Sequence, residues 1–167
     1  VSRKIGVVES GRAGSISFLQ GRLDVGQAMS PPLIRALKKR RASGRTVIID
    51  APPGTSCPVI ESIKRSDVCL LVTEPTPFGL HDLKLAAAAV KAMGIFRGVV
   101  INRSAPGDGN KRILDFCAEE DIPVLMMIPF DRRIAEAYAR GETLLEAIPA
   151  YRGAFLEMFA KIGGLGS

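Results

Sequence analysis

The 167-residue chain has little cysteine or histidine, with three cysteines, one histidine and no tryptophan. Cys57, Cys69 and Cys117 stand far apart, and no C-x-x-C pair occurs, so neither a structural zinc site nor a disulfide framework is indicated. Cys69 lies within an apolar run and is most simply a small buried hydrophobe. The single histidine, His81, fits a structural role better than a catalytic one. This cysteine usage is typical of a reducing compartment, so we expect a cytoplasmic protein.

The chain also lacks a hydrophobic run of membrane-spanning length. Its candidate apolar runs, at residues 68–72 and 124–128, are only long enough for strands. No signal peptide is expected, because the short apolar segment at residues 5–8 is followed at once by Glu9. With 47% hydrophobic and 24% charged residues, the composition is that of a soluble globular protein, and the length suits one domain. We therefore expect no membrane span.

Acidic residues are outnumbered, and the net charge is +6, with part of the positive charge in residues 38–41. Such a run can bind nucleic acid. It stands, however, at the end of an expected helix, where cations interact favourably with the helix dipole. Only two tyrosines and no tryptophan are present to stack on bases. We therefore favour a solvated helix end, and we do not expect nucleic acid as a partner.

From Thr46 onward, short apolar runs alternate with segments of helical periodicity. Expected strands are residues 46–50, 68–72, 98–102 and 124–128, and expected helices are about residues 59–63, 80–93, 110–120, 131–138 and 149–162. This alternation predicts a three-layer α/β/α fold with a mainly parallel sheet.

Before residue 46 the pattern is less regular. Residues 5–8 and 15–19 have the pattern of short strands in a hairpin around residues 11–14, and Ser30-Pro31-Pro32 opens a helix with a cap residue and an early proline. We expect a single domain over residues 1–167, in which 1–45 form N-terminal strands and a helix, 46–162 form the core, and 163–167 form a flexible tail.

Polar residues follow three of the expected strands, at the carboxyl edge where parallel sheets bind ligands. Asp50 ends the first of these strands, Asn102-Arg103 the third, and Pro129-Phe130-Asp131 the fourth. Burying a carboxylate at the end of an apolar strand is costly unless a nearby cation balances its charge. In a phosphate site, the expected cation is Mg²⁺ held through water. The alternative is that Asp50 only caps the turn that follows.

That turn, Asp50-Ala51-Pro52-Pro53-Gly54-Thr55, has a glycine that permits either a sharp bend or a close approach to a ligand. Its two prolines stiffen the approach. Taken alone, the hexapeptide is equally explained as a rigid turn.

Residues 47–55, VIIDAPPGT, resemble the Walker B strand and switch II loop of the ParA/MinD/Mrp group of deviant P-loop ATPases. Residues 72–83 (VTEPTPFGLHDL), 98–103 (GVVINR) and 128–141 (IPFDRRIAEAYARG) resemble the MinD-like branch that carries an inserted ferredoxin domain. The similarity covers nearly all of residues 5–162. It implies an incomplete P-loop NTPase-like fold with ATP and Mg²⁺ as cofactors.

The resemblance also implies roles for individual residues. Asp50 corresponds to the catalytic Walker B aspartate that positions Mg²⁺ through water, and Pro53, Gly54 and Thr55 belong to the switch loop, in which the Gly54 N–H senses the γ-phosphate. Asn102, followed by Arg103, corresponds to the asparagine that hydrogen-bonds adenine, and Pro129, Phe130 and Asp131 line the adenine pocket through their backbone. The alternatives are a strand-end turn for Asn102 and a helix N-cap for Asp131. We favour function for Asp50 and Asn102, and capping for Asp131.

The sequence departs from the family in two ways. No G-x-x-x-x-G-K-[ST] motif occurs, and the nearest glycine-rich segment, residues 10–15, is better explained as a hairpin turn. No ferredoxin cysteine cluster for 4Fe-4S clusters is present either. We therefore expect a trimmed C-terminal part that does not hydrolyse ATP alone. Its full-length relative would be a homodimeric ATP-dependent switch coupled to an iron–sulfur or redox protein. The alternative is a degenerate, non-catalytic interaction or dimerisation module.

A missing P-loop strand would leave the middle of the sheet open. Each orphaned backbone group would cost roughly 1–3 kcal/mol when buried. We expect the neighbouring strands to close up, residues 5–8 to fill the slot, or a second chain to supply a strand.

Overall fold

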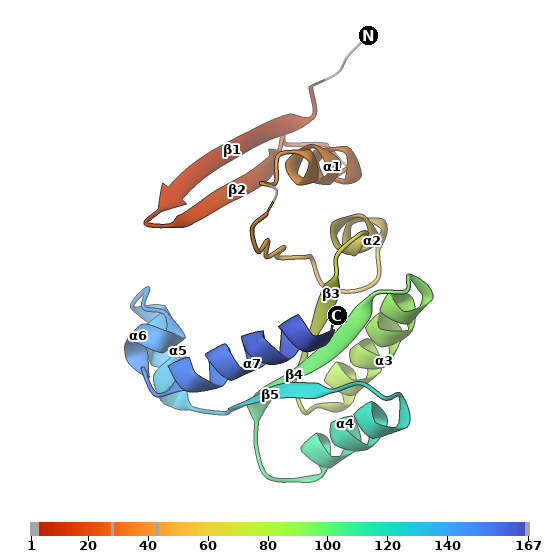
Figure 1. The fold of residues 1–167 in the computed structure, drawn as a ribbon, viewed down its shortest axis with the longest axis vertical. Coiled ribbons are helices and arrows are strands. Elements are labelled where there is room, and N and C mark those ends of the chain that lie inside the picture. Colours follow the sequence, from red (N-terminus) through yellow and green to blue (C-terminus); the bar gives the residue numbers. More distant parts are fainter. Residues whose placement is uncertain (1–3, 28, 43, 166–167) are drawn as a thin grey trace. The chain divides into compact units, whose positions relative to one another are not determined.

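The computed structural model describes residues 4–27, 29–42 and 44–165. The chain divides into two compact units, Val1–Lys64 (unit 1) and Arg65–Ser167 (unit 2). Figure 1 shows the elements of both units. The division falls after residue 64 rather than after residue 45, and a single domain over residues 1–167 stays a prediction.

Unit 1 begins with an antiparallel hairpin of β1 (Gly6–Ala13) and β2 (Ile16–Leu23), which confirms the expected hairpin. The chain turns at Gly14, whose φ of +57° suits glycine. The hairpin also overturns one expectation, because Gly6 pairs with Leu23 of β2 and the two sheets share no strand. Residues 5–8 therefore do not fill a slot in the parallel sheet.

Two helices complete unit 1, namely α1 (Pro31–Lys39) and α2 (Cys57–Ile63), and both confirm the sequence pattern. Helix α1 approaches β2 closely at Gly21, where a Cβ would stand 2.9 Å from side-chain atoms of Leu33 and Leu37. Ser30 precedes α1, but its side chain makes no capping hydrogen bond.

Lys38 of α1 is not simply solvated, contrary to the expectation for residues 38–41. Its Nζ donates hydrogen bonds to the backbone carbonyls of Glu61, Ser62 and Lys64, at 3.1, 2.7 and 2.5 Å. These carbonyls lie at the C-terminal end of α2, where they lack intrahelical partners and attract cations. Lys38 therefore joins α1 to the end of α2.

The expected strand at residues 46–50 is wrong. In the described part of the chain these residues pair with no strand, and the side chains of Val47 and Ile48 are 46% and 89% exposed. A β-branched run becomes a strand only when a neighbour satisfies its backbone N–H and C=O groups. No described segment does so here.

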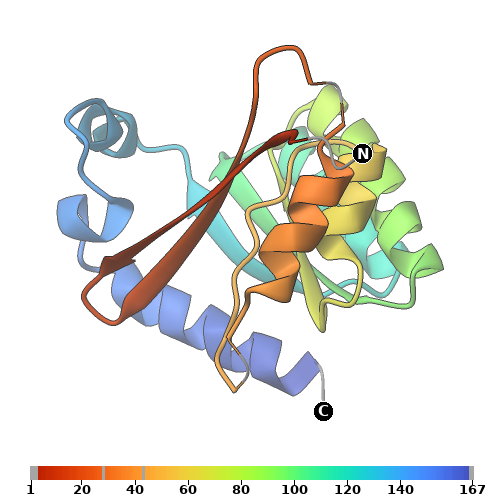
Figure 2. The same ribbon diagram turned by 90° about the horizontal axis from the view of Figure 1, so that it is seen from above.

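Unit 2 contains a parallel sheet of β3 (Val68–Thr73), β4 (Phe96–Ser104) and β5 (Val124–Pro129), in the order β3-β4-β5. Helices α3 (Pro77–Ala92) and α4 (Asp108–Glu119) cover one face. Helix α7 (Tyr151–Leu165) covers the other face, as Figure 2 also shows. The three-layer α/β/α architecture with a parallel sheet is confirmed within this unit.

The core of unit 2 lies between the sheet and α3 and α4. Val99 and Ile101 of β4 are fully buried, and so is Ile113 of α4, while Val90 of α3 is 2% exposed. Consecutive residues of β4 are buried because helices cover both faces of the sheet, which is the reason that a central parallel strand has a continuous apolar sequence.

The C-terminal elements differ in part from the expectation. Helix α5 (Arg132–Ala139) is confirmed, whereas the short helix α6 (Leu144–Ala147), which begins with a capping box between Thr143 and Glu146, was not expected. Helix α7 continues to Leu165, so the flexible tail is wrong for residues 163–165. Residues 166–167 lie outside the described residues. One face of α7 is half-buried at helical spacing, and this face continues to the glycines near the end of the helix; its residues are Tyr151, Phe155, Met158 and Ile162.

None of the described helices has the length and hydrophobicity needed to cross a membrane.

Candidate functional site

Unit 2 gathers polar and aromatic residues at the carboxyl edge of its sheet. The Phe130 N–H donates a hydrogen bond of 2.8 Å to the Ser104 carbonyl, which joins the ends of β5 and β4. The end of β3 joins them through a carboxylate oxygen of Glu74, which lies 3.6 Å from a guanidinium nitrogen of Arg103. Of the three strand ends that the sequence predicted to converge, those of β4 and β5 therefore meet here, whereas Glu74 of β3 was not among the predicted strand-end residues. We name these residues the strand-end cluster: Glu74, Asn102, Arg103, Phe130 and Asp131.

Asn102 occupies the centre of this edge, in β4 between two parallel neighbours. It is half-buried, and no other group in the described residues hydrogen-bonds its side-chain amide. An amide with a free donor and a free acceptor can match the paired donor and acceptor of a purine edge. The position and the side-chain amide of Asn102 therefore fit a contact with adenine, and that contact stays a prediction.

The next residue, Arg103, has an unusual backbone conformation. The pairing of β4 with β5 shifts register between Ile101 and Ser104, and Arg103 has a φ of +52°. A bulge of this kind re-aims a side chain out of the strand pattern. The Arg103 guanidinium carbon lies 5.3 Å from the centre of the Phe130 ring. The bulge thus places this guanidinium between an acidic and an aromatic neighbour.

Asp131 is an N-cap, as the sequence favoured. Its carboxylate accepts a hydrogen bond of 2.9 Å from the Arg133 N–H at the start of α5, and it also pairs with the Arg133 side chain. The hydrogen bonds from the Arg133 side chain and backbone hold the pKa of the Asp131 carboxyl below its usual value. A nucleotide contact for Pro129, Phe130 or Asp131 stays a prediction.

Three residues that support this edge were not singled out from the sequence. A Cβ at Gly79 would stand 2.2 Å from the Glu74 carbonyl oxygen, and one at Gly109 would stand 2.2 Å from the Pro75 carbonyl oxygen. Asn110 Nδ2 donates to Ser104 Oγ and to the Ala105 carbonyl, at 2.9 and 2.7 Å. Close backbone approach therefore requires these glycines. In the sequence, only the position of these three residues shortly after the strands could have indicated their supporting role.

In unit 1, the turn at residues 50–55 is an exposed loop. Asp50, Pro53, Gly54 and Thr55 are all exposed, so the expectation that Asp50 ends a buried strand is wrong. Gly54 has a φ of +86°, which explains why glycine is needed there. Asp50 lies in unit 1 and Asn102 in unit 2, so the meeting of these two side chains at one site stays a prediction.

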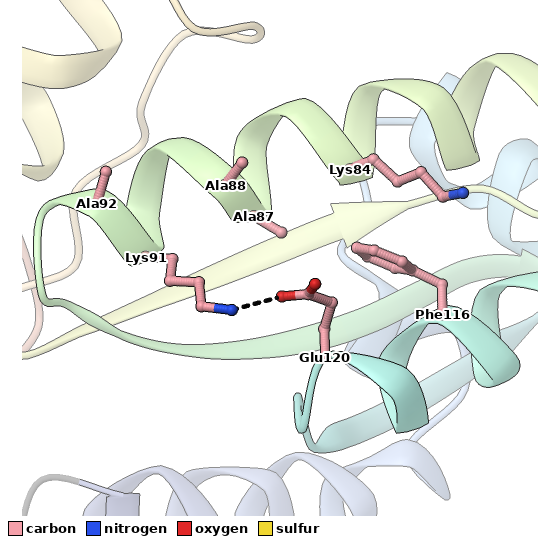
Figure 3. A pocket seen from close by; sticks show the side chains of 7 residues that line it. All are labelled: Lys84, Ala87, Ala88, Lys91, Ala92, Phe116 and Glu120. Carbon is pink, nitrogen blue, oxygen red and sulfur yellow. Dashed lines mark hydrogen bonds and ion pairs between the residues drawn. The ribbon is translucent and has the colours of Figure 1, made fainter.

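A shallow hollow of about 370 Å³ lies between α3 and α4 (Figure 3). An ion pair of 3.0 Å between Lys91 and Glu120 lies in it, and the Lys84 ammonium lies 5.4 Å from the centre of the Phe116 ring. The hydrogen bond from Lys91 lowers the pKa of Glu120. The hollow contains no residue of the strand-end cluster. In the described ranges, no group of three or more His, Cys, Asp or Glu side chains is placed to hold a metal ion.

No protein-family model matches the sequence. Two uncharacterized proteins of Methanocaldococcus jannaschii are similar to the chain. MJ0579 is 29% identical over 146 residues, which cover 86% of this chain and 50% of that protein, and MJ0578 is 23% identical over 164 residues, which cover 97% and 56%. The chain thus spans about half the length of the curated relatives it matches.

Solved structures similar to the chain are MinD cell-division proteins. The cell-division ATPase MinD of Pyrococcus furiosus has a TM-score of 0.65 and 25% identity, over 81% of this chain and 59% of that one. MinD of Aquifex aeolicus has a TM-score of 0.61 and 18% identity, over 80% and 59%. MinD of Pyrococcus horikoshii, complexed with Mg-ADP, has a TM-score of 0.59 and 23% identity, over 82% and 58%. The chain therefore has a MinD-like P-loop NTPase fold.

Proposed function

We propose that this chain is part of a ParA/MinD-like ATPase and binds the adenine end of ATP at the strand-end cluster. The observation that carries the proposal is the half-buried Asn102 side-chain amide at the centre of the sheet's carboxyl edge, for which the described residues supply no hydrogen-bond partner. Parallel sheets bind their ligands at this edge. The Mg-ADP in the Pyrococcus horikoshii MinD supports an adenine nucleotide as the ligand.

We further propose that the turn at residues 50–55 serves the phosphates. Asp50 would hold Mg²⁺ through water, and the Gly54 N–H would donate to the terminal phosphate. An exposed carboxylate fits an ion that keeps most of its water ligands, as Mg²⁺ does. The space beside Gly54 is open, so a phosphate can approach its backbone. When bound, Mg²⁺ neutralises charge on the phosphate oxygens.

Hydrolysis requires a phosphate-gripping loop, and the sequence contains no Walker A motif. We therefore propose that the 167 residues bind nucleotide without hydrolysing it. In the whole protein, nucleotide binding would drive a cytoplasmic homodimeric switch coupled to an iron–sulfur or redox partner. This coupling rests only on the resemblance of residues 72–83, 98–103 and 128–141.

The test is a titration of the 167-residue chain with Mg-ATP by isothermal calorimetry. Asn102→Ala should weaken binding about tenfold or more, because two hydrogen bonds to the base are lost. The preference for ATP over GTP should fall with it, since the amide reads the base edge. Gln20→Ala is the matched control, since that amide is exposed on β2 of unit 1 and is not expected to touch the base.

Equal affinity of Asn102→Ala and the wild type would contradict the adenine contact. A wild-type chain that binds no Mg-ATP would favour the alternative, a non-catalytic interaction module. Leu70 and Val72, which are 38% and 65% exposed on β3 at the edge of the described sheet, would then offer apolar surface for a partner.

A further inference from the structure

Side chains from all three strand ends of unit 2 meet at Arg103. Its guanidinium lies 3.6 Å from the Glu74 carboxylate at the end of β3, and 5.3 Å from the centre of the Phe130 ring after β5. These residues are 29 and 27 positions from Arg103 in the sequence. The contacts therefore depend on the sheet and on the bulge at the end of β4.

Stability does not explain this arrangement. The side chains of Arg103 and Glu74 are 57% and 42% exposed, and ion pairs in water at such exposure contribute little. Phe130 is 61% exposed, so its ring is left largely in solvent. Arg103 also adopts a positive φ, which is unfavourable for a residue with a long side chain. Unfavourable backbone conformations of this kind persist where a site needs a side chain in a fixed place.

The geometry points to Arg103 and Phe130 as the pair that stacks on the face of the nucleotide base, with Glu74 as a positioning residue that holds the guanidinium. This inference rests on the proposed function. A planar guanidinium and an aromatic ring both stack on the π-face of a base. Asn102, adjacent to Arg103, would read the base edge. The edge and the face of the base would then be recognised by Asn102 and Arg103 at the end of β4, together with Phe130 after β5.

The competing role for Arg103 is a phosphate contact, which is common for arginine. The Glu74 carboxylate argues against it, because it already partly neutralises the guanidinium and would repel a phosphate. The two roles also differ in what they predict for a ligand that has phosphates and no base. A stacking pair leaves the binding of inorganic triphosphate unchanged, whereas a phosphate ligand does not.

The experiment measures the affinity of the 167-residue chain for Mg-ATP and for Mg-triphosphate, with Arg103→Lys and Phe130→Leu as variants. Arg103→Lys keeps the charge and removes the plane, and Phe130→Leu keeps an apolar side chain and removes the ring. Each should weaken ATP binding about tenfold and leave triphosphate binding unchanged. The upfield NMR shift of the adenine H2 proton in the complex should shrink in Phe130→Leu. Phe130→Tyr should retain both the affinity and the shift.

Two control variants match these changes. Arg140→Lys alters a guanidinium whose pair with Glu142 has the same exposed fractions, 57% and 42%, as the Arg103–Glu74 pair. Phe96→Leu alters a ring of similar exposure, 56%, at the opposite end of β4. Neither should change ATP affinity. Glu74→Gln should weaken ATP binding about threefold, because the guanidinium loses its fixed position while the stacking groups remain.

The outcomes separate this inference from the proposed function. Weaker triphosphate binding in Arg103→Lys would overturn the stacking role in favour of a phosphate contact. Wild-type ATP affinity in both Arg103→Lys and Phe130→Leu would overturn it while the proposed function stands. Failure of the wild-type chain to bind ATP would overturn both. Circular dichroism and retained triphosphate binding show that each variant is folded, so a loss of ATP affinity is assigned to the base.

Discussion

In unit 2, β4 lies between two hydrogen-bonded neighbours and beneath helices, and Ile101, one residue before Asn102, is fully buried. In unit 1, residues 46–50 have an equally apolar sequence, yet they pair with no described strand, and Ile48, two residues before Asp50, is 89% exposed. The difference lies in the neighbours rather than in the residues. An apolar β-branched run supports a functional side chain at its end only where other segments supply hydrogen bonds and cover.

The largest expected difference is between two isoleucine truncations, one in the core and one in solvent. Ile101→Ala should lower the free energy of unfolding by about 2–5 kcal/mol, because it leaves a cavity in a packed core. Ile48→Ala should change it by less than about 0.5 kcal/mol, since its side chain is already in solvent. Urea unfolding followed by circular dichroism measures both changes. A comparable loss in Ile48→Ala would mean that residues 46–50 are packed in solution, and the comparison would fail.

Glycine substitutions sharpen the comparison between the first turn of α3 and the loop at residues 50–55. Gly79→Ala should destabilise the protein by about 1–3 kcal/mol, because its Cβ would stand 2.2 Å from the Glu74 carbonyl oxygen and backbone must move. Gly54→Ala meets no atom within 4 Å, and its cost should be about 1 kcal/mol, from the φ of +86° alone. Urea unfolding again gives both values. The reverse order would show that the loop in unit 1 is the more closely packed one.

The smallest effect concerns Asp131 and tests whether its role is capping alone. Because hydrogen bonds from Arg133 lower its pKa in the folded protein, the carboxylate contributes stability above its usual pKa of 3.8. That contribution is lost as pH falls through the lowered pKa of the folded state. Asp131→Ala should therefore be less stable than the wild type at pH 7, and the difference should diminish toward pH 2. A difference independent of pH would exclude the carboxylate's charge as its cause.

Local patterns were sufficient for most elements of unit 2. The apolar runs before Thr73, Asn102 and Pro129, together with the helical periods between them, predicted all three strands and the helices that follow each one. The predictions failed where the outcome depends on distant partners. The strand at residues 46–50 lacks a neighbour, and the tail at residues 163–165 is helical because earlier residues of α7 pack on the sheet.

The same limit applies to the candidate site. The places of Asn102 at a strand end and of Asp131 at a helix start were predictable because both features are visible in the sequence, while a nucleotide contact of either residue stays a prediction. The contact of Arg103 with Phe130 was not, because it depends on a bulge between β4 and β5 and on register across 27 residues. The need for glycine at positions 79 and 109 likewise arises from backbone atoms that only the folded chain brings near.

The hydrogen bonds from Lys38 to the last carbonyls of α2 have a further consequence for residues 40–56. These residues leave α1 and return to α2, and both helices are held together at Lys38. The segment that carries Asp50 and Gly54 is therefore a closed loop whose two ends are fixed independently of its path. A single proteolytic nick within it would break the covalent path from α1 to α2, but it would remove none of the hydrogen bonds by which Lys38 joins these helices.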